Sequence, residues 1–333
     1  MEKTEFKGKL FGSHVEIIAY GNVDKKILEE AYQEGVRLEK IFNFYDSMSE
    51  LSLLNKKRKM KVSSEFLDLL KLSLELCKKS DGSYDITFGK NFLERKSGKD
   101  LTKINCSYQD IRIKGDEVEL TDSDVIIDFG SVAKGYITDK ICEFLKKEGV
   151  EMFVINSRGD ILVFGKIHRL DIAHPRANDK SIGSILVENC GVATSGDYKQ
   201  YHEDYSKSHI VGARNYSSVT VIAPTLTEAD IYATVFSLIE EKEMEGILKE
   251  KKELMVLTIT KNLKMKKYNG FDKIFVEKKH KIEELFSKKK LNEDSQDSSE
   301  EWYVGDGPLN DNSREIFVRP GKKEDQEFVT KAS

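Results

Sequence analysis

One segment, residues 125–149 with the sequence VIIDFGSVAKGYITDKICEFLKKEG, most constrains how this chain can fold. The apolar run at 125–127 predicts a strand, and the periodic pattern over 133–148 predicts an amphipathic helix. A turn that leads from a strand into a helix N-terminus offers free backbone N–H groups, which favour an anion such as phosphate. Asp128 opens this turn and has the wrong charge for a phosphate contact. Another group must therefore share the site.

The rest of the chain alternates less regularly than a doubly wound fold requires. Helical periodicity with end signals covers 24–45, 63–82 and 227–250. Short apolar or alternating runs predict strands at 15–20, 117–120, 152–156, 160–165, 169–174, 181–188, 217–224, 254–260, 264–270 and 274–279. Helices interrupt groups of strands without strict βαβ order, which favours an α+β domain of mixed sheets over residues 1–280. Residues 288–333 are polar and acidic, and their composition predicts a mostly disordered tail.

Composition and charge exclude several classes of protein. The formal net charge is −4 over 333 residues, so there is no electrostatic case for a nucleic-acid partner. The four cysteines lie far apart without a CxxC pair, which predicts isolated thiols rather than a disulfide framework. No run approaches the ~18 consecutive apolar residues of a transmembrane helix, and the charged N-terminal stretch lacks the apolar region of a secretory signal. We therefore expect a cytoplasmic protein without a transmembrane segment.

A second candidate site lies at the start of the helix predicted over 227–250. Asp230 and Thr234 are four residues apart, on one helix face, and offer two hard oxygen atoms to one point. Such oxygens suit Mg²⁺ or Ca²⁺ rather than Zn²⁺. The alternative is structural, with Thr227 as the helix N-cap and Asp230 as the acid of a capping box. The pair alone does not decide between the two interpretations.

Other catalytic signatures are missing from the sequence. No GxSxG surrounds Ser195, no HExxH or His/Cys cluster occurs, and neither GxxxxGK[ST] nor GxGxxG is present. His209 stands alone before an apolar pair, a setting that is usually structural.

Seven short motifs occur in order along the chain. They are FGSHVEI from residue 11, YDSMSELSLLN from 45, SDGSYDIT from 80, DFGSVAKGYITD from 128, ATSGDY from 193, the pair His209 and Ile210, and Ala229-Asp230 followed by Thr234. Each motif alone is weak. Together, over residues 8 to about 275, they resemble the ApbE-type FAD:protein FMN transferases.

The resemblance implies Mg²⁺-dependent transfer of FMN from FAD to a Thr or Ser hydroxyl of a target protein, with release of AMP. It implies a single α+β, T-fold-like domain. By motif position, the metal ligands are the Ser131 main-chain carbonyl and the side chains of Asp230 and Thr234. The flavin-nucleotide contacts are Phe11, Tyr45, Ser83, Tyr84, Asp85, Asp128, Lys134 and Ile210.

The acceptor hydroxyl must lose its proton near the metal, and Asp230 and His209 are the candidate bases. We favour His209, because a carboxylate bound to Mg²⁺ is a weaker base. The usual target segment of the family does not occur in this chain, so the expected acceptor is a separate flavoprotein subunit.

The chain departs from the family pattern at two places. Gly212 and Ala213 follow His209 where Asp and Pro are common, and Arg158 takes the place of the first glycine in Asn-x-Gly-Gly-Asp. An arginine there can bind a phosphate as a bidentate donor or block part of the pocket. Two alternative functions therefore stay open: a Mg²⁺-dependent FAD pyrophosphatase that releases FMN and AMP, and a non-catalytic FAD-binding protein.

Overall fold

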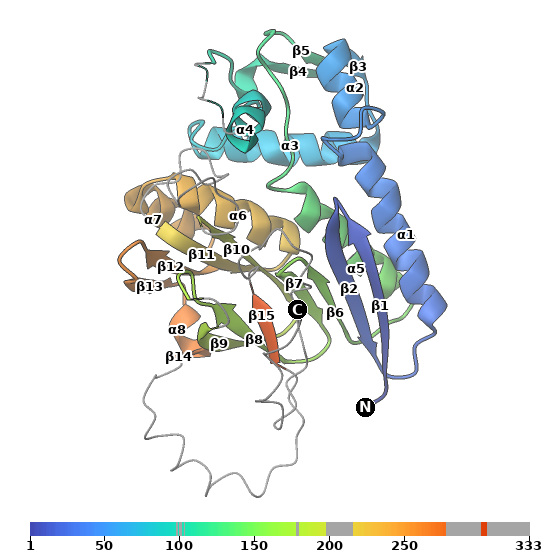
Figure 1. The fold of residues 1–333 in the computed structure, drawn as a ribbon, viewed down its shortest axis with the longest axis vertical. Helices are drawn as coiled ribbons and strands as arrows, with labels where there is room; N and C mark the ends of the chain where they lie inside the picture. The colour runs from blue at the N-terminus through green and yellow to red at the C-terminus, as the bar shows by residue number, and fades with distance from the viewer. Residues whose placement is uncertain are drawn as a thin grey trace, which may run out of the picture.

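An eight-stranded sheet organises the molecule in the computed structural model, which describes residues 1–97, 99, 102, 104–177, 180–197, 216–277 and 301–304 (Figure 1). The strand order is β1-β2-β6-β7-β10-β11-β12-β13, and all neighbours are antiparallel. The bounds are β1 Lys3–Leu10, β2 Ser13–Tyr20, β6 Phe153–Ser157, β7 Asp160–Phe164, β10 Cys190–Gly196, β11 Tyr216–Ala223, β12 Met255–Thr260 and β13 Met265–Tyr268.

Both faces of this sheet are covered. Helices α1 (Lys25–Phe42), α5 (Ala133–Lys147) and α6 (Leu226–Leu238) pack on one face, and the small sheet β14-β9-β8-β15 packs on the other. In β2, for example, Ile17 belongs to the helical core and Ile18 to the core shared with the small sheet. All eight residues of β11 are buried, as expected for a strand covered on both sides. The small-sheet bounds are β8 His168–Ala173, β9 Ser181–Val187, β14 Phe275–Glu277 and β15 Glu301–Val304.

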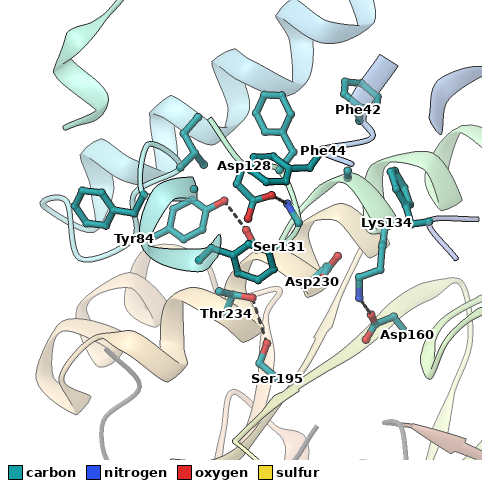
Figure 2. A pocket seen from close by; sticks show the side chains of 18 of the residues that line it. Phe42, Phe44, Tyr84, Asp128, Ser131, Lys134, Asp160, Ser195, Asp230 and Thr234 are labelled. Carbon is teal, nitrogen blue, oxygen red and sulfur yellow. Dashed lines mark hydrogen bonds and ion pairs between the residues drawn. The ribbon is translucent and has the colours of Figure 1, made fainter. Parts of the chain in front are cut away.

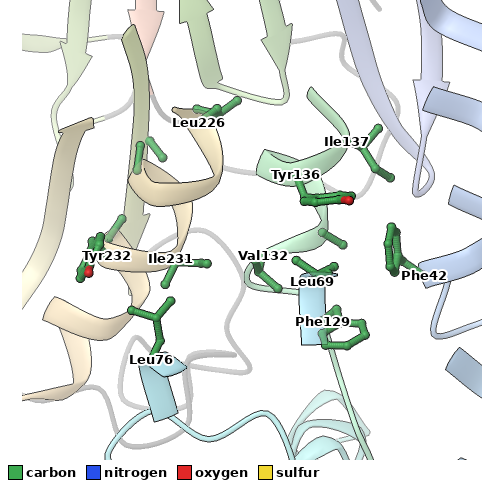
Figure 3. Close-up of a cluster of buried hydrophobic side chains, with 14 of the residues drawn as sticks. Phe42, Leu69, Leu76, Phe129, Val132, Tyr136, Ile137, Leu226, Ile231 and Tyr232 are labelled. Carbon is green, nitrogen blue, oxygen red and sulfur yellow. The ribbon is translucent and has the colours of Figure 1, made fainter. Parts of the chain in front are cut away.

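A third group of elements lies above the sheet in Figure 1. It contains α2 (Glu50–Lys57), α3 (Ser64–Lys79), α4 (Gly89–Lys96), a short 3₁₀ helix (Tyr108–Asp110) and the three-stranded sheet of β3 (Lys59–Lys61), β5 (Glu117–Leu120) and β4 (Ile111–Lys114). Its apolar residues join the helical core around Phe42 and Phe129, whose rings meet edge to face at 6.0 Å (Figure 3). The shared core makes these elements part of one α+β domain, which confirms the predicted fold class.

The strand predicted at 125–127 is extended but joins no named sheet among the described residues. Its one backbone bridge links Ile126 to Phe88. The Asn55 side chain takes the role of a neighbouring strand, since its amide donates to the Ile127 carbonyl at 2.9 Å and accepts from the Ile127 N–H at 2.8 Å. The segment 125–127 therefore leads into the turn before α5 without belonging to a named sheet.

The prediction of one helix over 227–250 was wrong. Helix α6 ends at Leu238, and α7 (Glu241–Glu250) begins after a capping box in which Glu240 and Glu243 satisfy each other's backbone N–H groups. The predicted N-cap was also wrong, because Thr225, not Thr227, accepts the hydrogen bond from the Glu228 N–H.

Several short elements escaped prediction, namely β1, β3, β4, α2, α4 and α8 (Phe271–Ile274). In the edge strand β1 the charged residues Lys3, Glu5, Lys7 and Lys9 occupy one face, and the other face holds only two large apolar side chains, Phe6 and Leu10. Within 288–333 the structure describes only β15, which pairs in parallel with β8; the rest of the predicted disordered tail lies outside the described residues. In the described ranges, no helix combines the length and apolar character needed to cross a bilayer.

Candidate functional site

A cavity of about 320 Å³ is lined by the β1–β2 turn, the end of α1, the start of α4, the turn before α5, the β6–β7 turn, β10 and α6 (Figure 2). Its lining includes Phe11, Tyr45, Ser83, Tyr84, Asp85, Asp128, Ser131, Lys134, Asp230 and Thr234. The structure therefore brings together every predicted site residue that it describes. His209 and Ile210 lie outside the described residues.

Aromatic side chains form one wall of the cavity. The Phe44 ring packs edge-on against Tyr45 and Phe92, with centroid distances of 5.7 and 6.4 Å. These contacts hold the wall in place, while Tyr45 itself is 61% exposed. An anchored wall with an exposed ring suits a planar aromatic ligand. Sequence reasoning selected Tyr45 and missed Phe44 and Phe92, whose role depends on how the segment after α1 meets α4.

The turn before α5 divides its side chains between core and cavity. Phe129 and Val132 are buried in the helical core, and Asp128 and Ser131 line the cavity, which Phe129 also reaches. The Asp128 carboxylate accepts a hydrogen bond from the Gly130 N–H at 2.9 Å, which braces the turn. The apolar residues of the turn thus anchor it in the core, and its polar side chains face the cavity.

Tyr84 and Asp85 support this turn and the loop beside it. The Tyr84 hydroxyl lies 3.0 Å from the Ser131 hydroxyl, and burial raises the pKa of Tyr84, which keeps it protonated. The Asp85 carboxylate accepts from the Thr87 N–H and the Tyr108 N–H, each at 2.9 Å. Burial raises the pKa of Asp85 in spite of these bonds. Asp85 thus orders the loop, and its flavin contact stays a prediction.

Lys134, in the first turn of α5, forms an ion pair with Asp160 at the start of β7. The Lys134 Nζ and Asp160 Oδ2 atoms are 2.7 Å apart, and the Asp160 side chain is 3% exposed. The other Asp160 oxygen accepts from the Thr194 N–H at 3.3 Å. Asp160 was missed by sequence reasoning, although it directly follows Arg158-Gly159 in the chain. Its importance appears only where β7 meets α5.

Asp230 and Thr234 lie on the cavity side of α6. Asp230 is 5% exposed, and its Oδ2 accepts from the Gly135 N–H at 3.2 Å. The Thr234 hydroxyl is 3.2 Å from the Ser195 hydroxyl at the end of β10. The predicted pairing of these two side chains on one helix face is confirmed, while the capping-box interpretation of Asp230 was wrong because Thr225 and Glu228 occupy those positions.

Helices α5 and α6 cap each other. Asp139 of α5 accepts from the Leu226 and Thr227 N–H groups at the start of α6, each at 2.8 Å. In return, Asp230 of α6 accepts from the Gly135 N–H in the first turn of α5, whose own N-cap residue provides no side-chain hydrogen bond. Each carboxylate satisfies N–H groups that a helix start leaves without an intrahelical partner. This exchange fixes Asp230 beside the turn that carries Ser131.

The donor set at this point fits a hard cation. Among the described residues no three His, Cys, Asp or Glu side chains gather around one point. A divalent ion would therefore rely on Asp230 together with hydroxyl and carbonyl oxygens, including Thr234 and the Ser131 carbonyl. An all-oxygen set with one carboxylate is typical of Mg²⁺, which usually completes its shell with water and substrate phosphates.

Two other features of the sequence have structural roles. Asp197, in the ATSGDY motif, forms a two-pronged ion pair with Arg176, with both N–O distances 2.7 Å, and so anchors the end of β10. The four cysteines are buried free thiols, as predicted. Burial raises the pKa of Cys77 and of Cys190 to about 12, so neither is a thiolate nucleophile at neutral pH.

Comparison with known proteins places this arrangement in a family. The profile of the ApbE family matches residues 11–258. The "FAD:protein FMN transferase" of Escherichia coli K12 is 29% identical over 240 residues, which covers 60% of this chain and 66% of that protein, just under two thirds of its length. The protein of the same name from Buchnera aphidicola is 25% identical and covers 77% of this chain and 86% of its own.

Solved structures show the same fold. The ApbE protein of Thermotoga maritima superposes with a TM-score of 0.72 at 21% identity, over 82% of this chain and 99% of that one. The flavin transferase ApbE of Vibrio cholerae gives a TM-score of 0.69 at 23% identity, over 82% and 99% of the two chains. The family profile spans most of the chain and includes the described cavity-lining residues, so this protein belongs to the ApbE family.

Proposed function

We propose that this protein transfers the FMN part of FAD to a Thr or Ser hydroxyl of a separate target protein, with Mg²⁺, and releases AMP. The observation that carries the proposal is the convergence of Asp128, Ser131, Lys134, Asp230 and Thr234 on one cavity with an aromatic wall. The relatives named FAD:protein FMN transferase support the same assignment.

The charge of the cavity supports a divalent cation. Its described lining holds four carboxylates, of Asp85, Asp128, Asp160 and Asp230, and two cations, Lys134 and Arg158. Their formal sum, 2 − 4, is −2, the same sign as the pyrophosphate of FAD. Like charges inside a partly enclosed site repel strongly, so a bound divalent cation would offset this repulsion.

The aromatic wall is suited to the isoalloxazine ring, and the polar end to the pyrophosphate. The acceptor hydroxyl oxygen would attack the phosphorus atom on the FMN side. The bond from that phosphorus to the bridging oxygen breaks, AMP leaves with the bridging oxygen, and the hydroxyl proton passes to a base. Bound Mg²⁺ would neutralise the charge that develops on the phosphoryl oxygens.

This chain's residues would position the groups for that step. Asp160 holds the Lys134 ammonium within the cavity wall, and the reciprocal caps hold Asp230 beside the turn at Ser131. We propose His209 as the base that takes the proton, with Asp230 as the alternative. His209 is preferred because a carboxylate committed to a cation is less basic.

The test is to incubate the protein with FAD, Mg²⁺ and a flavoprotein subunit that carries a Thr target segment. We expect the acceptor mass to rise by one FMN and one AMP to appear per modified acceptor, with both products lost when EDTA is added. Equal amounts of free FMN and AMP without acceptor would instead identify a pyrophosphatase. Unchanged FAD bound in stoichiometric amount would identify a storage protein.

The C-terminal tail is expected to be dispensable for flavin binding. All described cavity-lining residues precede residue 239, and β15 pairs with β8 on the opposite face of the central sheet from α6. A variant that lacks residues 288–333 should bind FAD with a Kd within about twofold of the full chain, measured by flavin fluorescence. Loss of the β15 pairing exposes the β8 edge, so self-association by light scattering is the expected side effect. A large loss of FAD affinity in a monomeric truncated protein would contradict this expectation.

A further inference from the structure

The turn between β6 and β7 places an arginine where the backbone favours asparagine or glycine. Arg158 and Gly159 connect the paired residues Ser157 and Asp160, with φ values of +54° and +85°. Positive φ at both central residues is the geometry of a type I′ hairpin turn, for which Asn-Gly is preferred. An arginine in this conformation is strained, and strained residues that line a cavity are candidates for ligand contacts. The Arg158 side chain is therefore a candidate for a ligand contact.

The Arg158 side chain forms part of the cavity wall. Its Nη1 donates to the Ser13 hydroxyl at 3.2 Å, which links the β6–β7 turn to the start of β2. Ser13 also lines the cavity, beside Phe11. A guanidinium has five N–H donors in a fixed plane, so the bond to Ser13 orients the group in the cavity wall while it uses one of these donors. The cavity is open with Arg158 in its wall, so the arginine does not plug it.

The second cation in the described lining has a different position. Lys134 lies 2.7 Å from the buried carboxylate of Asp160, an ion pair that compensates much of its charge. The other carboxylates of the lining leave the described cavity with a negative formal charge. Arg158 lies in the same wall, on the hairpin of Asp160 and two residues from it, so its positive charge would offset part of the repulsion between these carboxylates and an anionic ligand.

We propose that Arg158 binds the phosphate-bearing part of the dinucleotide and so selects phosphorylated flavin over riboflavin. This inference rests on the proposed function, because it takes FAD as the ligand. The planar fork of arginine matches two phosphate oxygens at once, which a lysine cannot reproduce.

The test compares Arg158→Gln, Arg158→Lys and the wild-type chain by titration with FAD, ADP and riboflavin. With Arg158→Gln we expect the Kd of FAD and of ADP to rise about tenfold, the loss typical of one charge-assisted contact. The Kd of riboflavin should stay within about twofold, and Arg158→Lys should fall between Gln and wild type. Arg158→Gly removes the backbone strain and should lose the same affinity, so a folding defect is separated from the binding effect.

A matched control is Arg112→Gln. Arg112 is exposed on β4 and its replacement changes the net charge by the same amount, so the Kd of FAD should not change. Unchanged FAD and ADP affinity in both Arg158→Gln and Arg158→Gly would overturn the inference, as would an equal loss of riboflavin binding. If the wild-type chain binds FAD but transfers no FMN, the proposed transferase function fails while the binding data still decide the role of Arg158.

Discussion

Asp230→Asn is expected to remove most of the Mg²⁺-dependent turnover while leaving the fold intact. The amide oxygen can still accept from the Gly135 N–H, so the link between α6 and α5 survives. The negative charge that would hold the cation is lost. We expect kcat/KM to fall by roughly a hundredfold or more, which corresponds to about 2.7 kcal/mol of transition-state stabilisation. AMP release with FAD and a Thr acceptor measures this, and thermal unfolding checks the fold.

Asp139→Asn is the control, because Asp139 is a half-buried carboxylate that also caps a helix but lies outside the cavity lining. Both of its oxygens accept backbone N–H groups, so an amide nitrogen must face one of these donors. We expect a loss of about 1–3 kcal/mol in unfolding free energy with kcat largely retained. Full turnover in Asp230→Asn would contradict the metal assignment. A stability loss in Asp230→Asn equal to that in Asp139→Asn would show that Asp230 is mainly structural.

Gly135→Ala is expected to cause a large loss of stability. A Cβ at Gly135 would stand 2.7 Å from the Leu226 carbonyl oxygen and 2.8 Å from the Thr227 Cα. These are backbone atoms at the start of α6, so they cannot rotate away. We expect the free energy of unfolding to fall by about 3 kcal/mol, at the upper end for overpacking. Because the clash pushes α6 away, FAD turnover should fall as well, through displacement of Asp230.

Gly246→Ala provides the opposite case in the same fold. Gly246 is an exposed position within α7, and nothing lies within 4 Å of the point that a Cβ would occupy there. Alanine should stabilise this helix by roughly 0.5–1 kcal/mol. Urea unfolding of the two variants side by side measures both shifts. Near-wild-type stability in Gly135→Ala would mean that α5 and α6 can separate more easily than their close approach indicates.

Local patterns were sufficient for elements with a clear apolar period. Helices α3 and α5 were predicted because their apolar positions recur with helical spacing, and strands β2 and β11 because each is a short run rich in apolar and β-branched residues. The sequence pattern was insufficient in segments with many charged residues and in segments where helical periodicity continues past the true end of a helix. Edge strand β1 has few apolar positions, and the break between α6 and α7 depends on a two-glutamate capping box inside an otherwise helical sequence.

Some residues of the site could likewise be predicted from the sequence, and others could not. The order of the motifs along the chain identified Asp128, Ser131, Lys134, Asp230 and Thr234, and the structure gathers them in one cavity. Asp160, Phe44 and Phe92 escaped because their roles come from contacts with other elements of the fold, which the local sequence pattern does not specify.

The sequence by itself determined the α+β class, the family resemblance and the residue types that an oxygen-ligated cation and a flavin nucleotide require. Only the tertiary structure decided what Asp139, Asp160 and Asp230 do. Asp139 and Asp230 exchange caps between two helix starts that are 93 residues apart, from 133 to 226. Asp160 reaches Lys134 across the contact of β7 with α5. The physical reason is that a helix start and a cation are satisfied by whichever carboxylate packing brings within hydrogen-bond distance, and local sequence carries no record of that partner.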